Sequence, residues 1–198
     1  MSKTKVGFAL TGSFCTFGKV FAVIETLVRQ GCEVTPILSE RSAKEDTRFF
    51  SSEKVWQTLE ELTGKRPLST LSEVEPIGPQ KLLDAYIIAP MTGASMGKMA
   101  HGIFDTTALL GAKSHLRNSR PVLVAPSTND GLSIAAENIG KILAMRNVYM
   151  VPFRQDDPIG KPRSVVADFE RIPEALAAAL AGAQMQPILL GSLKNERK

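Results

Sequence analysis

The sequence contains few of the residues that usually build metal sites, disulfide scaffolds or membrane spans. Its only two cysteines, Cys15 and Cys32, form no C-x-x-C pair, so the spacing of a zinc site or a redox-active dithiol is missing. A disulfide scaffold is not expected in a chain of 198 residues. No apolar run reaches the roughly eighteen residues that a membrane-spanning helix requires. Residues 11–13 interrupt the N-terminal apolar run, which favours a core strand over a signal peptide, and we expect a cytoplasmic protein.

The composition also lacks the features of a nucleic-acid-binding or disordered protein. Aromatic residues make up only 6% of the chain, and no block of lysine and arginine is interleaved with them. The formal net charge of +4 is explained more simply by a weak attraction for anionic metabolites or phosphates. Hydrophobic residues account for 43% of the sequence, which is enough to form a buried core.

Short apolar runs alternate with segments of helical spacing along most of the chain. Continuous apolar runs are typical of parallel strands buried on both faces, so the alternation predicts an α/β fold with a doubly wound parallel sheet, Rossmann-like or flavodoxin-like. We expect a single domain over residues 1–182, a C-terminal tail over residues 183–198 and a polar loop at residues 154–163. The expected strands are residues 6–10, 33–38, 84–89, 121–125 and 148–151, and the expected helices are residues 17–29, 41–64, 94–110, 134–145 and 172–183.

Small or hydroxyl residues follow four of the expected strands, at residues 11–13, at Ser39, at residues 90–95 and at residues 126–129. Ligands of open parallel sheets bind at the carboxyl ends of the strands, where glycine permits close approach and helix N-termini offer N–H groups to anions. Each loop alone could be an ordinary turn or helix cap, but the four together favour a ligand that carries a phosphate. The G-x-G-x-x-G and Walker patterns are missing, which argues against a standard NAD site and against ATP hydrolysis.

No side chain in the sequence predicts an obvious catalytic group, so the catalytic residues are unknown at this point. His101, inside an expected helix, and His115, in an expected loop, are interpreted as structural or surface residues. A Ser-His-Asp triad has no support. Cys15 is interpreted as a small packing residue, because buried thiols are usually inert.

The strand-end motifs resemble those of the flavoprotein family that includes FMN-dependent cysteine decarboxylases and flavin prenyltransferases. The resemblance covers about residues 5–151, and it implies an FMN cofactor. The family's FMN contacts carry over to Gly12, Ser13, Ser39, Thr92 and Ser95, and Asn129 matches a residue near flavin and substrate. The motifs that carry the resemblance are Gly12-Ser13, Pro90-Met91-Thr92-Gly93-Ala94-Ser95 with Lys98, Ala100, Gly102 and Asp105, and Pro126-Ser127-Thr128-Asn129.

Departures from the family pattern argue against two of its activities. Ala94 stands where the family has asparagine, no histidine precedes residue 101, and no cysteine follows Cys32. Decarboxylation of a cysteinyl substrate would therefore lack its base and its proton donor. Prenyl transfer would need a subsite for an isoprenyl phosphate, and we identify none. Both activities remain weaker alternatives.

Within the family, the chain is most similar to members that form the B component of a two-component enzyme. That similarity implies oxidation of a dihydropyridine dicarboxylate together with an A component, in the mother cell of a sporulating bacterium. The hydride could pass to flavin or to NAD(P) on the partner. The alternative is a non-catalytic flavin-binding scaffold whose partner does the chemistry.

The dicarboxylate substrate needs cationic partners, for which Lys161 and Arg163 are candidates if residues 154–163 form a mobile lid rather than a solvated loop. Relatives assemble as trimers or multiples of trimers with flavin at the boundary between two copies, which implies a homo-oligomer here. Phe49, Phe50 and Trp56 could cap a neighbour's site, although packing within the core is the simpler interpretation.

Overall fold

The computed structural model describes residues 3–191, and its centre is one sheet of seven strands in the order β2-β1-β3-β4-β7-β6, with β5 also paired to β4. Strands β1 to β5 pair in parallel, whereas β6 and β7 form an antiparallel hairpin that joins β4. The α/β prediction is confirmed, and the sheet is mixed at one edge. The strands are β1 (Lys5–Leu10), β2 (Glu33–Leu38), β3 (Ala85–Met91), β4 (Val122–Thr128), β5 (Val148–Met150), β6 (Phe153–Asp157) and β7 (Lys161–Ala167).

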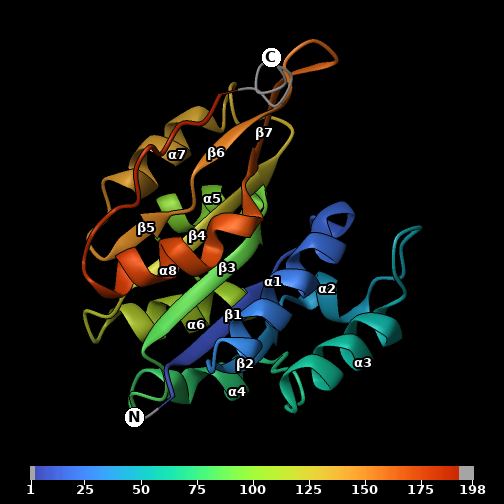
Figure 1. The fold of residues 1–198 in the computed structure, drawn as a ribbon, viewed down its shortest axis with the longest axis vertical. Coiled ribbons are helices and arrows are strands. Elements are labelled where there is room, and N and C mark those ends of the chain that lie inside the picture. The colour runs from blue at the N-terminus through green and yellow to red at the C-terminus, as the bar shows by residue number, and fades with distance from the viewer. Residues whose placement is uncertain (1–2, 192–198) are drawn as a thin grey trace.

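Helices cover both faces of the sheet. Helices α1 and α8 pack together on one face, and α5 and α6 lie on the other (Figure 1). The two helix layers enclose the sheet, which is the architecture expected for parallel strands. The helices are α1 (Phe17–Arg29), α2 (Glu40–Lys44), α3 (Ser52–Thr63), α4 (Leu71–Val74), α5 (Gly93–Ala100), α6 (Thr107–Leu116), α7 (Ala136–Leu143) and α8 (Ile172–Leu180).

The register of the parallel strands brings their carboxyl ends to one edge of the sheet. Val6 of β1 lies beside both Val34 of β2 and Ala85 of β3, and every residue of β3 is buried. Because neighbouring strands run in the same direction and start level, the loops that follow them emerge side by side. This alignment places the small and hydroxyl residues of these loops close together.

The single helix expected over residues 94–110 is two helices, α5 and α6, so that prediction is wrong. Helix α5 ends in a Schellman motif: Gly102 adopts φ 72°, its N–H donates to the Met99 carbonyl, and the Ile103 N–H donates to the Lys98 carbonyl. The hydroxyl of Thr106 then caps α6. A left-handed glycine inside an apparent helical pattern was the signal for the break.

The mostly helical segment expected over residues 41–64 is also divided, into α2 and α3. Phe50, in the loop between these helices, stacks on Phe17 and meets Phe21 edge to face. The indole Nε1 of Trp56 donates to the Ala43 carbonyl at 3.0 Å, which ties α3 to α2. Phe50 and Trp56 therefore pack within the chain, as the simpler interpretation held, whereas Phe49 is exposed.

The polar loop expected at residues 154–163 is wrong, because this segment belongs to the hairpin β6–β7, and its role as a lid stays a prediction. Strand β5 pairs with the first part of β4, at Val122–Val124. Strand β7 pairs with the last part of β4, on from there, with Val166 opposite Ser127. The buried Arg154 donates to the Asp168 carboxylate at 2.8 Å. The first three residues of β7 are exposed and include two charged side chains and a proline, so sequence-based prediction did not find this strand.

Part of the segment predicted as a C-terminal tail hydrogen-bonds with the sheet. The Gln184 side chain accepts from the Met150 N–H at 2.8 Å, and Phe153 exchanges backbone hydrogen bonds with Ile188 and Leu190. Residues 192–198 of the predicted tail lie outside the described residues. The domain boundary at residue 182 stays a prediction.

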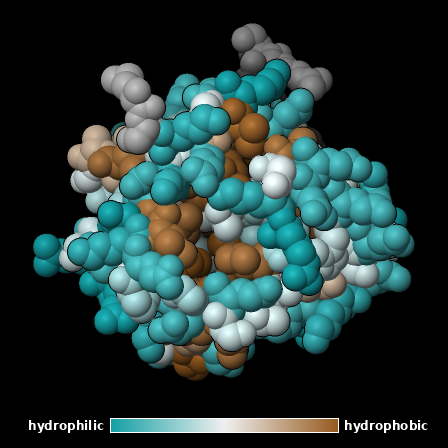
Figure 2. All heavy atoms as spheres, turned by 90° about the horizontal axis from the view of Figure 1, so that it is seen from below, coloured by the Kyte–Doolittle hydropathy of each residue, from teal (hydrophilic) through white to brown (hydrophobic). Residues whose placement is uncertain are grey.

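The surface combines polar side chains with scattered apolar ones. The face seen in Figure 2 is mostly hydrophilic, but hydrophobic residues gather around a hollow near its centre. Ile134 and Ile159 are the most exposed of the large hydrophobic side chains in the described part of the chain. Across residues 3–191, none of the helices has the combination of length and apolar character that crossing a membrane demands. Single exposed apolar residues are normal on protein surfaces and imply no function.

His115 lies in helix α6 rather than in the expected loop, and it is only 1% exposed. Its ring packs beside Tyr86, and its Nε2 has no hydrogen-bond partner among the described residues. Burial, together with the nearby charge of Arg120, lowers the pKa of His115 to about 4. The side chain is therefore neutral at pH 7 and is part of the core.

Replacement of His115 by Gln should flatten the decline of the free energy of unfolding at acidic pH. The pKa is about 4 when folded and about 6.5 when unfolded, so the unfolded state binds the proton first as pH falls. The wild-type stabilisation is complete above about pH 6.5 and is lost towards about pH 4, with about 2 kcal/mol gone at about pH 5. Urea unfolding over this range measures it.

His101→Gln is the matched control, because His101 is exposed at the end of α5. It should keep the wild-type pH dependence of the free energy of unfolding. An unchanged slope in His115→Gln would show that the buried imidazole does not control acid stability.

Candidate functional site

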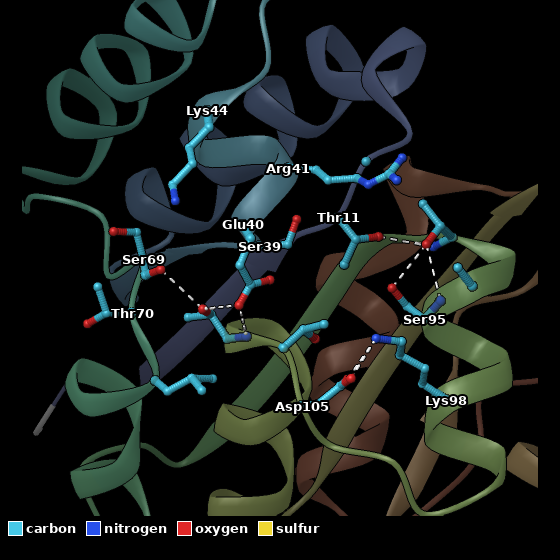
Figure 3. Close-up of a pocket in the computed structure, with 16 residues that line it drawn as sticks. Thr11, Ser39, Glu40, Arg41, Lys44, Ser69, Thr70, Ser95, Lys98 and Asp105 are labelled. Atoms are coloured by element: carbon cyan, nitrogen blue, oxygen red, sulfur yellow. Dashed lines mark hydrogen bonds and ion pairs between the residues drawn. The ribbon is translucent and has the colours of Figure 1, made fainter.

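A cavity of about 830 Å³ lies at the carboxyl ends of β1, β2 and β3 (Figure 3). Its walls come from the β1–α1 loop, the start and body of helix α2, residues 69–71, residues 92–98 at the start and middle of α5, and residues 105–107. The volume falls in the range of about 300–1,000 Å³ that is usual for small-molecule and cofactor sites. The cavity therefore occupies the edge where the sequence predicted a ligand.

Four helices begin at this cavity. The hydroxyl of each N-cap residue accepts a hydrogen bond from the backbone N–H three residues later, which fixes the first turn of the helix. Helix N-termini carry partial positive charge, and the longer helices α5 and α6 contribute most to it. The cavity is thus suited to an anion. The four N-cap residues are Ser39 of α2, Thr70 of α4, Thr92 of α5 and Thr106 of α6.

The side chain of Thr11 joins the ends of β1 and β3. Its buried hydroxyl donates to the Pro90 carbonyl at 2.7 Å and accepts from the Thr92 N–H at 3.0 Å. Gly12 follows directly and lines the cavity, so the hydroxyl of Thr11 holds the β1–α1 loop against the start of α5. Only a side chain that both donates and accepts can make this bridge.

Ser13, the next residue, does not line the cavity. Its hydroxyl lies 2.8 Å from the hydroxyl of Ser127, at the end of β4. A Cβ on Gly93 would come within 2.6 Å of the Thr128 hydroxyl, so glycine is required where α5 starts against β4. These contacts bring the end of a fourth strand beside the first three.

Three cations and two carboxylates line the cavity, an excess of one positive charge (3 − 2 = 1). Lys98 pairs with both oxygens of Asp105, at 2.7 and 2.9 Å, and this bond lowers the pKa of Asp105. Glu40 accepts through Oε1 from the N–H and the hydroxyl of Thr107. Both acids therefore hold the walls together. The remaining cations, Arg41 and Lys44, are on α2.

The cavity unites four of the five residues predicted to bind the cofactor, and it excludes the predicted substrate residues. Ser13 lies beside the lining rather than in it. Asn129, Lys161 and Arg163 are exposed and do not line the cavity, and Lys161 pairs with Asp156 at 3.0 Å. The four residues that line the cavity together are Gly12, Ser39, Thr92 and Ser95.

Several lining residues were missed by reasoning from the sequence. Thr11 belongs to the strand-end residues 11–13 named from the sequence, but it was not predicted as a cofactor contact. Lys44 lay inside an expected helix, Thr107 lay inside the expected continuous helix 94–110, and Ser69 lay between expected elements. No local pattern brings these last residues to the cavity, because only the packing of α2, α4 and α6 does so.

Neither cysteines nor histidines line the cavity in the described part of the chain. Cys15 is exposed, so its interpretation as a packing residue is wrong. His101 caps the exposed end of α5, where its Nε2 lies 3.0 Å from Lys141 Nζ. Within residues 3–191, no three His, Cys, Asp or Glu side chains are grouped to hold a metal ion.

The profile of the family described as Flavoprotein matches residues 1–178. The chain belongs to the flavoprotein family. This membership confirms the resemblance carried by the strand-end motifs. The chain is 40% identical over 186 residues to the B subunit of dipicolinate synthase from Bacillus subtilis strain 168, which covers 94% of this chain and 93% of that protein.

Solved structures agree with this membership. The crystal structure of the dipicolinate synthase B subunit from Bacillus halodurans is 42% identical and matches with a TM-score of 0.88 over 96% of this chain and 97% of that one. DmrB from Burkholderia xenovorans, in complex with FMN, shares the fold at 15% identity, with a TM-score of 0.68 over 90% of this chain and 96% of that chain.

Substitution of Thr11 by Val should lower the free energy of unfolding by about 1–3 kcal/mol, because the half-buried Thr92 N–H and the Pro90 carbonyl lose their partner while the side-chain volume is kept. Thr11→Ser keeps the hydroxyl, so its free energy of unfolding should fall by less. Urea unfolding of the two variants measures the difference. A Val variant as stable as the Ser variant would contradict a bridging role for the hydroxyl.

Proposed function

We propose that this flavoprotein binds FMN in the cavity and acts as the B component of a dipicolinate synthase. In this proposal it works with the A component of that enzyme to oxidise dihydrodipicolinate to dipicolinate during sporulation. The name of the 40% identical relative supports the proposal and implies a partner protein. The setting that follows is the mother-cell cytoplasm of a sporulating bacterium.

The observation that carries the proposal is the convergence of helix N-termini and hydroxyls on one cavity whose lining has a net positive charge. A phosphate monoester is a dianion that accepts several hydrogen bonds, and this donor set matches it. Gly12, Thr92 and Ser95 would hold the phosphate, and Ser39 would contact the adjoining part of the cofactor. Ser13, tied to Ser127, would complete the rim.

Oxidation of a dihydropyridine dicarboxylate removes two electrons and two protons and leaves an aromatic pyridine. When bound, FMN supplies a two-electron acceptor for this chemistry, and NAD(P) on the A component is the alternative acceptor. The residues of this chain would bind and orient the planar substrate and keep water away from it. The assignment of Asn129, Lys161 and Arg163 to substrate binding, from the rim, stays a prediction, as does a homotrimer or a multiple of trimers.

A non-catalytic role is the second candidate, and the state of the cavity acids favours it. Glu40 is held by Thr107, and Asp105 is held by Lys98, so both lining carboxylates are already bonded. A general base needs a free acceptor within reach of the proton that it removes. Under this second hypothesis, the chain binds FMN to shape a complex in which the A component does the chemistry.

Replacement of Ser95 by Asp should weaken FMN binding about tenfold or more while leaving riboflavin binding nearly unchanged. The new carboxylate would repel the phosphate, which riboflavin lacks. Quenching of flavin fluorescence in titrations with the purified chain measures both affinities.

Ser95→Asn is the matched control, since it has the shape of Asp without the charge. An acidic residue in the first turn of α5 is also compatible with the helix, so the fold should survive. Equal FMN affinities for the Asp and Asn variants would place the phosphate away from Ser95. A wild-type chain that binds neither flavin would remove the proposed cofactor.

The redox and scaffold hypotheses differ in what dihydrodipicolinate does to the flavin spectrum. If this chain carries the reaction, anaerobic addition of freshly prepared dihydrodipicolinate to the FMN-loaded chain should bleach the visible flavin absorbance. If the chain is a scaffold, the absorbance should persist with and without the A component, while dipicolinate forms only when the A component and NAD(P) are present. Bleaching that requires the A component would assign the flavin a role in the complex only.

A further inference from the structure

The cavity has a second polar end, opposite the start of α5. In Figure 3, Lys44 extends from α2 into the cavity on the side of Ser69 and Thr70, whereas Ser95 and Lys98 lie on the other side. Two polar groups separated across one cavity can serve two different anionic groups.

Lys44 is the cavity cation that is left without a counter-charge. Lys98 is neutralised by Asp105, and Arg41 faces Glu45 at 3.8 Å. The side chain of Arg41 also extends away from Lys44 and packs against Gly12, at the opposite end of the cavity. Lys44 forms no ion pair with any residue in the described range 3–191.

Ser69 presents a fixed but unused hydroxyl at the same end. Its carbonyl accepts from the Thr107 hydroxyl at 3.1 Å and its N–H donates to Glu73, so the backbone is held on both sides. Its own hydroxyl has no hydrogen-bond partner among residues 3–191. The neighbouring Thr70 hydroxyl is occupied by the cap of α4. Ser69 can therefore offer a donor without breaking an existing bond.

We propose that Lys44 and the Ser69 hydroxyl form a second oxyanion subsite, which binds one carboxylate of the dicarboxylate substrate. This inference rests on the proposed function, in which the start of α5 takes the FMN phosphate. One ammonium and one hydroxyl suit a singly charged carboxylate. The carboxylate of Glu40, on the same helix, is bound through Oε1 at the N-terminus of α6, and among the described residues it forms no ion pair with Lys44.

The proposed subsite has a cation, Lys44, that lines the cavity, whereas the predicted substrate residues Lys161 and Arg163 do not line it. Those two residues are exposed on β7, and Lys161 is paired with Asp156. Lys44 lines the cavity itself, so a dicarboxylate would meet it without any movement of the hairpin.

Replacement of Lys44 by Gln should weaken binding of the stable probe pyridine-2,6-dicarboxylate about tenfold. Isothermal titration calorimetry on the FMN-loaded full chain measures it. Ser69→Ala should weaken the same affinity about threefold, the usual effect of one hydrogen bond. Lys44→Arg should restore most of the loss, because it keeps the charge. Lys54→Gln is the matched control, an exposed lysine of α3 outside the cavity lining, and it should bind like the wild type.

The affinities for FMN and riboflavin decide which anion Lys44 serves. Both should stay within about twofold of the wild-type values in Lys44→Gln. A selective loss of FMN over riboflavin would assign Lys44 to the phosphate and overturn the proposal. Unchanged affinity for the dicarboxylate in Lys44→Gln, or no measurable affinity in the wild type, would overturn it as well.

Failure of the proposed function has a different signature from failure of the subsite. A wild-type chain that binds no flavin would remove the FMN assignment. In that case the dicarboxylate titration is repeated on the flavin-free chain, where a Lys44-dependent affinity would support the subsite alone. A flavin-free chain with no such dependence would overturn it.

Discussion

The site depends on one hydroxyl that crosses between two strands. Thr11 directly follows β1 in the middle of the sheet, and its side chain bonds both to the backbone near the end of β3 and to the N–H of the residue that caps α5. Because it donates and accepts at once, it fixes the distance between two loops that are 79 residues or more apart in sequence. Gly12 and the N-terminus of α5 face one cavity because this bridge holds them side by side.

The two carboxylates of the cavity hold its walls together, and this limits the chemistry that the walls can offer. Glu40 caps the N–H and the hydroxyl at the start of α6, and Asp105 holds Lys98 in the second half of α5. The bonds of Glu40 join α2 to α6, which are distant in sequence. The bond between Asp105 and Lys98 joins α5 to the loop that follows it. The consequence is electrostatic: Lys98 and Asp105 neutralise each other, and Glu40 is bound at the N-terminus of α6. The lining then keeps its excess of one positive charge, to which the partial positive charge at the N-terminus of α5 is added. An anionic ligand is favoured without an isolated buried charge.

The parallel half of the fold was predictable from the sequence, because strands buried on both faces leave continuous apolar runs such as that of β3. The hairpin β6–β7 was not, since its turn is charged and the first half of β7 is exposed. For the site, residues just after strands or in the next helical turn were found, including Gly12, Ser39 and Ser95. Lys44 and Ser69 reach the cavity through the packing of α2 and α4, a long-range outcome that no local spacing encodes.

The same packing determines which groups of the cavity could accept a proton in the proposed oxidation. Neither described histidine is at the cavity, since His115 is buried in α6 and His101 is at the exposed end of α5. The two lining carboxylates already accept hydrogen bonds that hold the walls, so removing a proton from a substrate would compete with the stability of the site itself. Binding and orientation are therefore what these walls can provide at no structural cost. In the proposed oxidation, the proton would therefore pass to an acceptor from outside this lining, which agrees with the proposed two-component enzyme.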